Sequence, residues 1–284
     1  MKLKFEHVLC NICKQNNSSI LFRIDKNKTK FNVVMCNNCK LAYLNPRLTQ
    51  DQLQKVYVED QLINFEYYLA SKKLDEKTFA ARLNLIKKFI SVGTVLDIGS
   101  SIGTFLSVAK SEGWRAYGIE LNKKSAEYSK ACGHKLFDDY EKTKLKFNFV
   151  NMSDVIEHFT DPKEELTKIY NLLCNDGVLL ISTPNFENKL TRKLAIKPYE
   201  HLYYFTPKTI SLLLNKCGFM VKYFKPTTRN LSVKALIYSS TFNRSKLKLL
   251  LLSLLIHTRF YMILDKIINN LNPDMLIVAQ KIKT

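Results

Sequence analysis

The feature that most constrains the fold is a regular alternation of short apolar segments and amphipathic segments in the middle of the chain. Strand patterns at 94–98, 115–120, 147–152 and 178–182 alternate with helix patterns at 104–112, 123–132 and 162–174. Such alternation is typical of a parallel sheet that helices cover on both faces. We therefore expect an α/β fold with mostly parallel strands.

A glycine-containing turn follows the first of these strands and points to a ligand site. The turn is Gly-Ser-Ser-Ile-Gly at 99–103, and the second strand ends at Glu120. Ligands of open parallel sheets bind beyond the carboxyl ends of the strands, and an acid about 20 residues after the turn can accept hydrogen bonds from ribose hydroxyls. The turn lacks the third glycine of a dinucleotide motif, which favours a nucleoside cofactor without a pyrophosphate.

Four of the seven cysteines form two closely spaced pairs, Cys10-x-x-Cys13 and Cys36-x-x-Cys39. Each pair can direct two thiolates at one ion, and two pairs supply the four ligands of a tetrahedral zinc site. The residues between the pairs contain two strand patterns, 20–24 and 31–35, which indicates a zinc ribbon. Because protein fills all four positions, we favour a structural zinc site over a catalytic or redox one.

The charge balance and the N-terminal residues bear on partners and location. The chain carries 44 basic and 25 acidic residues, a formal charge of +19. This excess favours acidic partners such as nucleic acid, phosphorylated metabolites or an anionic membrane. A lysine-biased, solvated surface also explains it, and we prefer that interpretation because no arginine-rich or aromatic-basic cluster is present. We expect no signal peptide and no spanning helix, hence a cytoplasmic location.

The middle of the chain resembles a known enzyme superfamily. The run VLDIGSSIGTFLSVAKSEGWRAYGIELN is similar to the first two motifs of class I S-adenosylmethionine-dependent methyltransferases, and NMSDVIEHFTDPKEELTKIYNLLCNDGVLLISTPN and EHLYYFTPKTISLLLNKCGF resemble its later segments. With its cysteine pairs, the chain resembles zinc-ribbon-bearing bacterial methyltransferases of the methyltransferase-23 and methyltransferase-12 type. The resemblance implies a Rossmann-like class I methyltransferase sheet, mostly parallel with an antiparallel last strand, preceded by a small N-terminal four-cysteine zinc ribbon.

The resemblance also implies S-adenosylmethionine as cofactor and assigns residues to it by position. Glu120 would hold the ribose, and Ser101 stands where the family often has a glycine. The remaining assignments are Asp97, Gly99, Ser101 and Gly103 around the amino-acid part, Asp138 or Asp139 near the adenine with Phe137 available to stack on it, and Ser153 and Asp154 at the methionine end. Asp97 could instead brace the loop, and Asp138 and Asp139 could instead belong to a solvated turn.

Methyl transfer also needs a group that removes the proton of the acceptor. His158 and His201 are the candidate catalytic residues, because histidine titrates near neutral pH and both lie where the substrate is expected to enter. Each histidine could instead shape its loop through hydrogen bonds. We favour this structural role for His158, and the two roles are balanced for His201.

These features divide the chain into a zinc ribbon at 1–45, a helical connector at 46–90 and a methyltransferase domain at 91–284. The connector is expected to hold one helix opened by a capping box at Thr49 and a second over about 74–90, with Phe65–Tyr68 between them. A basic, leucine-rich insertion at about 226–272 is expected to form a lid or, over 245–270, a helix in peripheral contact with a membrane.

The predicted activity is a methyltransferase (EC 2.1.1.-) acting on a small-molecule acceptor, such as a sugar, a quinone-like compound or a lipid-linked metabolite. The alternative is an RNA methyltransferase whose zinc ribbon and basic surface hold nucleic acid. We favour the small-molecule acceptor because the segment at 153–156 lacks the Asn-Pro-Pro-aromatic type of motif that binds a planar amine.

Overall fold

The computed structural model describes residues 3–26, 29–53, 61–189, 192, 196–197, 200–227 and 274–282. They form two compact units. The first unit contains the described parts of Met1–Val58, Leu145–Pro226 and Pro273–Thr284, and the second contains those of Glu59–Lys144 and Thr227–Asn272.

The predicted insertion at 226–272, with its helix at 245–270, lies outside the described residues apart from Pro226 and Thr227. Within the described part of the chain, no helix combines the length and the apolar character that crossing a membrane requires.

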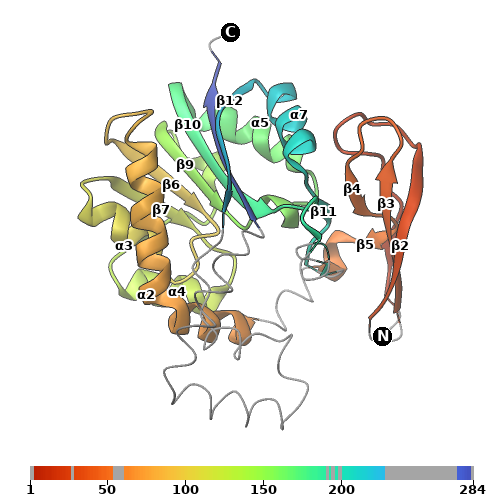
Figure 1. Ribbon diagram of the computed structural model, residues 1–284. Coiled ribbons are helices and arrows are strands. Elements are labelled where there is room, and N and C mark those ends of the chain that lie inside the picture. Colours follow the sequence, from red (N-terminus) through yellow and green to blue (C-terminus); the bar gives the residue numbers. More distant parts are fainter. Residues whose placement is uncertain are drawn as a thin grey trace. The chain divides into compact units, whose positions relative to one another are not determined.

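A seven-stranded sheet has the strand order β12-β13-β10-β9-β6-β7-β8 (Figure 1). In the second unit β6, β7 and β8 pair in parallel. In the first unit β9 and β10 pair in parallel, whereas the last strand, β13, runs antiparallel to β10. The predicted α/β sheet with an antiparallel last strand is therefore confirmed. The strands are β6 Thr94–Ile98, β7 Arg115–Ile119, β8 Lys135–Leu136, β9 Phe147–Ser153, β10 Leu173–Pro184, β12 Phe219–Thr227 and β13 Asp274–Lys281.

The second unit is built around β6, whose five residues are all buried. Helices α3 (Thr104–Ser111) and α4 (Lys123–Ala131) connect its strands, and the short helix η1 follows at Tyr140–Lys142. Helix α4 begins where the Asn122 side chain accepts a hydrogen bond from the N–H of Ser125.

Helix α2 spans Gln61–Ile86 without interruption, so the break predicted at Phe65–Tyr68 is wrong. The ring of Phe65 packs edge-on against Tyr128 of α4, with centroids 5.6 Å apart. The ring of Phe79 packs in the same way against Phe105 of α3, at 5.4 Å. These tertiary contacts hold aromatic residues in a helix despite their modest intrinsic helix propensity.

In the first unit, helix α5 (Pro162–Leu172) packs against β10, and the short helix η2 (Ile156–His158) follows β9. Helix α7 spans Pro207–Lys216, and Thr206 and Thr209 form a reciprocal capping box at its start. Asp161 caps α5 by accepting a hydrogen bond from the N–H of Glu164.

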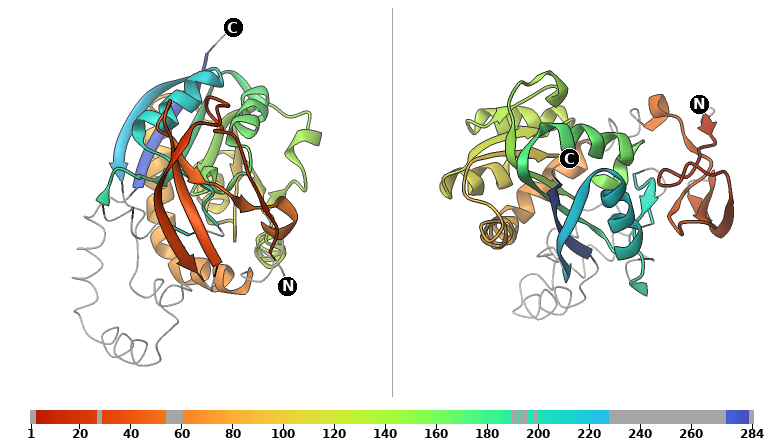
Figure 2. Two further views of the ribbon diagram at one scale, coloured as in Figure 1. Left: turned by 90° about the vertical axis from the view of Figure 1, so that its right-hand side faces the viewer. Right: turned by 90° about the horizontal axis from the view of Figure 1, so that it is seen from above.

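The N-terminal part of the first unit, here called the cysteine module (residues 3–48), contains five short strands (Figures 1 and 2). They are β1 Phe5–Glu6, β2 Ser18–Lys26, β3 Thr29–Cys36, β4 Ala42–Leu44 and β5 Arg47–Leu48. β2 and β3 contain the two strand patterns predicted between the cysteine pairs, and they pair antiparallel. The four-stranded sheet of the module has the order β11-β4-β3-β2, so one of its strands, β11 (Tyr203–Tyr204), comes from far along the chain.

Candidate functional site

The turn between β6 and α3 is held against the end of β7. The backbone N–H groups of Gly99 and Ser100 donate to the carbonyl of Ile119, at 2.9 and 2.8 Å. Gly99, Ser101 and Gly103 adopt positive φ angles of 75°, 47° and 81°. Ser101 thus occupies a left-handed conformation that glycine adopts more easily, which explains why the family often has a glycine at this position.

Glu120 links this turn to the start of α4, because each of its carboxylate oxygens accepts one backbone N–H group. Oε2 accepts a hydrogen bond from the N–H of Ser101 at 2.7 Å, and Oε1 accepts one from the N–H of Asn122 at 2.6 Å. Burial raises the pKa of Glu120, and the N–H donors oppose this rise. The acid predicted at the end of the second strand therefore does lie beside the turn.

Gly103 is a glycine for two physical reasons. Its φ is positive, and a Cβ on it would lie 2.4 Å from Cδ2 of His134 and 2.5 Å from Oγ of Ser129. The imidazole of His134 lies 3.0 Å from Oγ of Ser107, and burial, followed by the charges of Lys110 and Lys72, lowers its pKa. Close packing under the turn thus requires this glycine independently of any ligand.

Several buried polar atoms around the turn have no hydrogen-bond partner among the residues that the structure describes, namely Oγ of Ser100, Ser101 and Ser129 and Nδ1 of His134. Buried polar groups are normally paired with protein, water or ligand. Two of these hydroxyls belong to the turn itself, so the turn fits a polar ligand such as the amino-acid part of S-adenosylmethionine.

The other residues that the sequence assigned to the cofactor lie in different surroundings. Asp97 is buried in β6. The side chain of Asp138 is 97% exposed and forms an ion pair with Lys130 at 3.6 Å. Asp139 caps η1, and the ring of Phe137 stacks on Tyr117 at 5.3 Å. The turn and Glu120 are brought together, whereas Asp138 faces solvent.

Ser153 and Asp154 mark the end of β9 in the first unit. The hydroxyl of Ser153 donates to Oδ1 of Asn151 at 3.0 Å. Asp154 has a φ of 58°; its N–H donates to the carbonyl of Ser182 at 2.8 Å, and its Oδ1 accepts from the Ser182 hydroxyl at 3.2 Å. Asp154 is thereby fixed to β10.

Glu157 and His158, which follow β9, form a compact group with His201, which precedes β11; it is here called the Glu157–histidine group. Their ligand atoms lie within 4.8 Å of one another, so the group could also hold a metal ion. The two histidine rings meet edge to face with centroids 4.8 Å apart. Only 2% of Glu157 and 6% of His201 is exposed. The structure therefore brings both predicted histidines together.

The protonation states of this group follow from burial and hydrogen bonds. Burial, strengthened by the charge of Asp154, raises the pKa of Glu157 to about 8, although the hydroxyl of Thr183 donates to its Oε2 at 2.9 Å. Burial lowers the pKa of His158. Nδ1 of His158 lies 2.8 Å from the carbonyl of Glu200, which can only accept, so Nδ1 carries the proton and Nε2 is free of it.

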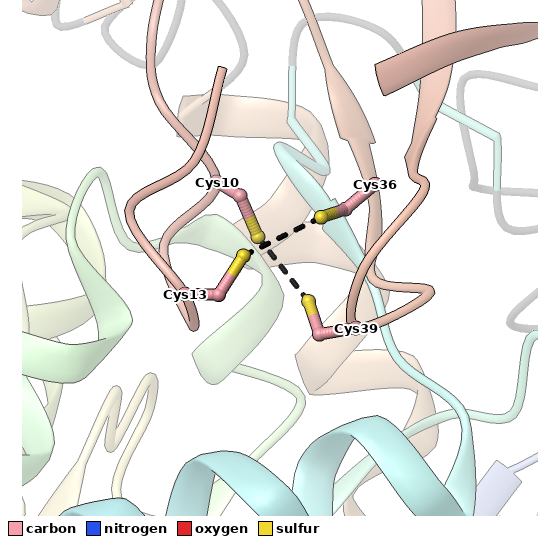
Figure 3. A group of neighbouring side chains, drawn as sticks. All are labelled: Cys10, Cys13, Cys36 and Cys39. Atoms are coloured by element: carbon pink, nitrogen blue, oxygen red, sulfur yellow. Dashed lines mark hydrogen bonds between the residues drawn. The ribbon is translucent and has the colours of Figure 1, made fainter. Parts of the chain in front are cut away.

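The four predicted zinc ligands converge in the cysteine module (Figure 3). The Sγ atoms of Cys10 and Cys39 are 3.4 Å apart, those of Cys13 and Cys36 are 3.5 Å apart, and all four lie within 4.8 Å of one another. Tetrahedral Zn–S bonds of about 2.3 Å place sulfur atoms about 3.8 Å apart. The cluster therefore fits a zinc ion.

The backbone around the cysteines supports the same conclusion. Lys14 and Lys40, the residues after the two pairs, have positive φ angles and donate their N–H groups to the carbonyls of Cys10 and Cys36. Burial raises the pKa of Cys39 to about 11. At Cys36 burial also acts to raise the pKa, but hydrogen bonds, first those from the N–H groups of Cys39 and Asn38, outweigh burial and lower the pKa to about 7. A cation would stabilise the thiolates that burial disfavours.

Sequence reasoning missed Arg47, Thr183 and strand β11 as parts of this region. Arg47 lies in β5, and only 8% of it is exposed. Strand β11 pairs with β4 through Tyr203–Tyr43 and Tyr204–Ala42. No local sequence pattern predicts a pairing between segments so distant in the sequence.

The fold and the turn after β6 define the class: a Rossmann-like α/β protein of the class I methyltransferase type. Residues 70–223 match the methyltransferase-23 family, described as a methyltransferase domain. Because this match spans more than half of the chain, the protein belongs to that family of S-adenosylmethionine-dependent methyltransferases. None of the proteins with curated functions matches the chain.

Solved structures share the fold at low sequence identity. A methyltransferase from Thermotoga maritima, described as a possible histamine N-methyltransferase, is 18% identical with a TM-score of 0.53, over 81% of this chain and 99% of that one. A chain from the complex between the Haloferax volcanii Trm112 methyltransferase activator and a putative methyltransferase is 13% identical with a TM-score of 0.55, over 83% and 100%. The plantazolicin methyltransferase BamL, solved with a triazolic desmethylPZN analog and SAH, is 14% identical with a TM-score of 0.55, over 82% and 95%.

Proposed function

We propose that this methyltransferase acts on a nucleophilic group of a small-molecule acceptor and that His201 or His158 removes the acceptor's proton. The observation that carries the proposal is the Glu157–histidine group, in which two imidazoles meet beside a buried carboxyl group directly after β9. In open α/β sheets, ligands bind beyond the carboxyl ends of the strands. A base at this position is therefore suited to act on a bound acceptor.

S-adenosylmethionine, when bound, supplies a methyl group on a sulfonium that is already an activated leaving group. We assign Glu120 to its ribose, because each carboxylate oxygen accepts one N–H group and keeps a lone pair for a further donor. The remaining assignments are Asp97 and the Gly99–Gly103 turn for the amino-acid part and Ser153 with Asp154 for the methionine end. Asp138 or Asp139, whose side chains are 97% and 38% exposed, is assigned to the adenine.

The proposed base is a neutral imidazole. Burial lowers the pKa of His158, so its ring is uncharged at neutral pH, and the proton on Nδ1 leaves Nε2 as the acceptor. With a pKa of about 8, Glu157 is mostly protonated at the same pH. A neutral Glu157 does not attract a proton onto its neighbours, and this favours the uncharged imidazoles.

Burial of the group favours a small acceptor. With 2% of Glu157 and 6% of His201 exposed, only a molecule that enters between the surrounding side chains can reach these groups. We therefore favour a sugar, a quinone-like compound or a lipid-linked metabolite as the acceptor class. The formal charge of +19 is the observation that favours the alternative, an RNA acceptor.

The test uses methyl-labelled S-adenosylmethionine and cell fractions. The purified full-length protein is incubated with a small-molecule fraction, a lipid fraction and a total RNA fraction, and label transfer is measured in each. His201→Gln and His158→Gln are compared with His7→Gln, a substitution of an exposed histidine. We expect label in the small-molecule or lipid fraction, and a loss of about 10²- to 10⁴-fold in rate when the base is removed.

Two results would overturn the proposal. Label that appears in the RNA fraction and disappears after ribonuclease treatment would establish the alternative acceptor. Full activity in both His201→Gln and His158→Gln would show that neither imidazole is the base.

A further inference from the structure

Arg47 of the cysteine module is a buried cation that joins three separate segments. Its Nε donates to Oε1 of Glu6 at 2.8 Å. Its Nη1 donates to the carbonyl of Thr160 at 2.8 Å and to the hydroxyl of Tyr203 at 3.2 Å. The Tyr203 hydroxyl in turn donates to the same carbonyl of Thr160 at 3.1 Å. One guanidinium thus holds a loop and a strand at fixed positions.

These two segments carry the two histidines. Thr160 lies two residues after His158, and Tyr203 lies two residues after His201. Between them, the backbone of Leu202 makes two further bonds. Its N–H donates to the carbonyl of Glu157 at 2.8 Å, and its carbonyl accepts from the N–H of Leu44 at 2.9 Å. The strand that follows His201 is therefore held from both sides, by Glu157 and by the cysteine module.

The chemistry of the guanidinium suits this role. Arginine offers five N–H donors in a rigid plane and stays charged at any accessible pH, so it can hold several acceptors in one fixed arrangement. Burying a charge for stability alone is inefficient, because hydrophobic packing of similar volume is often equally stabilising. Nearby, Asn11 donates to Oδ1 of Asp161 at 2.7 Å and accepts from the N–H of Lys163 at 3.0 Å, so the same loop is held at a second point.

We propose that Arg47 is a positioning residue that sets the relative placement of the His158 and His201 rings through Thr160 and Tyr203. The cysteine module is then part of the acceptor-binding machinery and not an independent appendage. This inference rests on the proposed role of the histidine pair. It concerns the geometry of the pair and not the transfer step itself.

The test observes the histidine rings directly in the full-length protein. The chain has five histidines, so ring ¹⁵N signals can be assigned by single His→Gln substitutions, and their shifts report which nitrogen carries the proton. We expect the signals of His158 and His201 to move in Arg47→Met and in Tyr203→Phe. The signals of His134, which lies in the other compact unit, stay in place.

Matched variants separate positioning from general stability. Arg23→Met makes the same change at an exposed arginine of the cysteine module and should leave all five ring signals unchanged. Arg47→Lys should move the two signals back toward their original positions, because an ammonium group can still donate to the carbonyl of Thr160. A purely structural role would lower the thermal midpoint of Arg47→Met without moving the His158 and His201 signals relative to Arg23→Met.

Unchanged His158 and His201 signals in Tyr203→Phe, which removes one hydroxyl and keeps the ring, would overturn the inference even if Arg47→Met fails to fold. The readout needs no turnover, so this failure is distinct from failure of the proposed function. If the proposed function fails, the His158→Gln and His201→Gln variants keep full methyl transfer, while Arg47→Met still moves the ring signals of His158 and His201.

Discussion

Replacing Glu120 by glutamine tests the cofactor site at the residue that connects the glycine-containing turn to β7. The glutamine carbonyl can accept only one of the two N–H groups, from Ser101 and Asn122, that the carboxylate now accepts. The amide NH₂ then faces the second N–H, and one charge-assisted hydrogen bond is lost. An unpaired buried donor costs about 1–3 kcal/mol. If the hydrogen bonds to the ribose hydroxyls weaken by a similar free energy, the Kd for S-adenosylmethionine rises about 10- to 100-fold.

Isothermal titration calorimetry at neutral pH measures this effect on Glu120→Gln, with Glu127→Gln as the matched control. Glu127 is exposed on α4 and has no assigned role in the cofactor site, so its amide variant should bind like the unmodified protein. Burial raises the pKa of Glu120, so on acidification this carboxylate is protonated at a higher pH than an ordinary glutamate. The affinity for S-adenosylmethionine should therefore begin to fall at that higher pH. Equal Kd values for Glu120→Gln and the unmodified protein would refute the assignment of Glu120 to the ribose.

Three further predictions follow from the packing and the charges. Metal analysis should find one zinc per chain on the four cysteines, and Cys36→Ser should lower that content and the stability of the cysteine module while S-adenosylmethionine still binds. Gly103→Ala should destabilise by about 1–3 kcal/mol more than Gly133→Ala, because both glycines have positive φ but only a Cβ at Gly103 meets neighbouring atoms, as chemical denaturation can measure. Burial raises the pKa of Glu157 to about 8 from 4.5, so its protonated form favours the folded state, and this contribution is present below pH 4.5 and is lost as the pH rises to about 8. The free energy of unfolding should therefore decline less between pH 5 and pH 8 in Glu157→Gln than in the unmodified protein or in Glu127→Gln, an exposed control. Equal declines in all three proteins would contradict this prediction.

Features with a local signature could be predicted from the sequence. The strands of the parallel sheet, the hairpin between the cysteine pairs and the cap of α7 at Thr206 all depend on residues within one or two turns of the chain. The placement of Glu120 beside the turn also followed from local order, because parallel strands β6 and β7 end at the same edge. Its contact with the cofactor remains a prediction.

Features set by contacts between distant segments could not be predicted. The sequence predicts Phe65–Tyr68 between two helices, but these residues lie inside one continuous helix. There Phe65 packs on Tyr128, and the ammonium of Lys124 lies 4.3 Å from its ring centroid. Tyr203 lies in β11 and pairs with Tyr43 of β4, and burial raises its pKa to about 12. In both cases the partner that decides the structure lies in another part of the sequence.

Because β11 pairs with β4, cofactor binding and proton removal are expected to depend differently on the cysteine module. From sequence alone, the four cysteines and the cofactor residues form separate modules. That separation applies to Glu120, whose hydrogen bonds lie within the second compact unit. It does not apply to His201, because β11 is hydrogen-bonded to β4, and β4 pairs with β3, which ends at Cys36. We therefore expect loss of order at the cysteines to affect the strand after His201, which is two steps of backbone pairing away. We expect the two hydrogen bonds of the Glu120 carboxylate to persist, because both lie within the second unit.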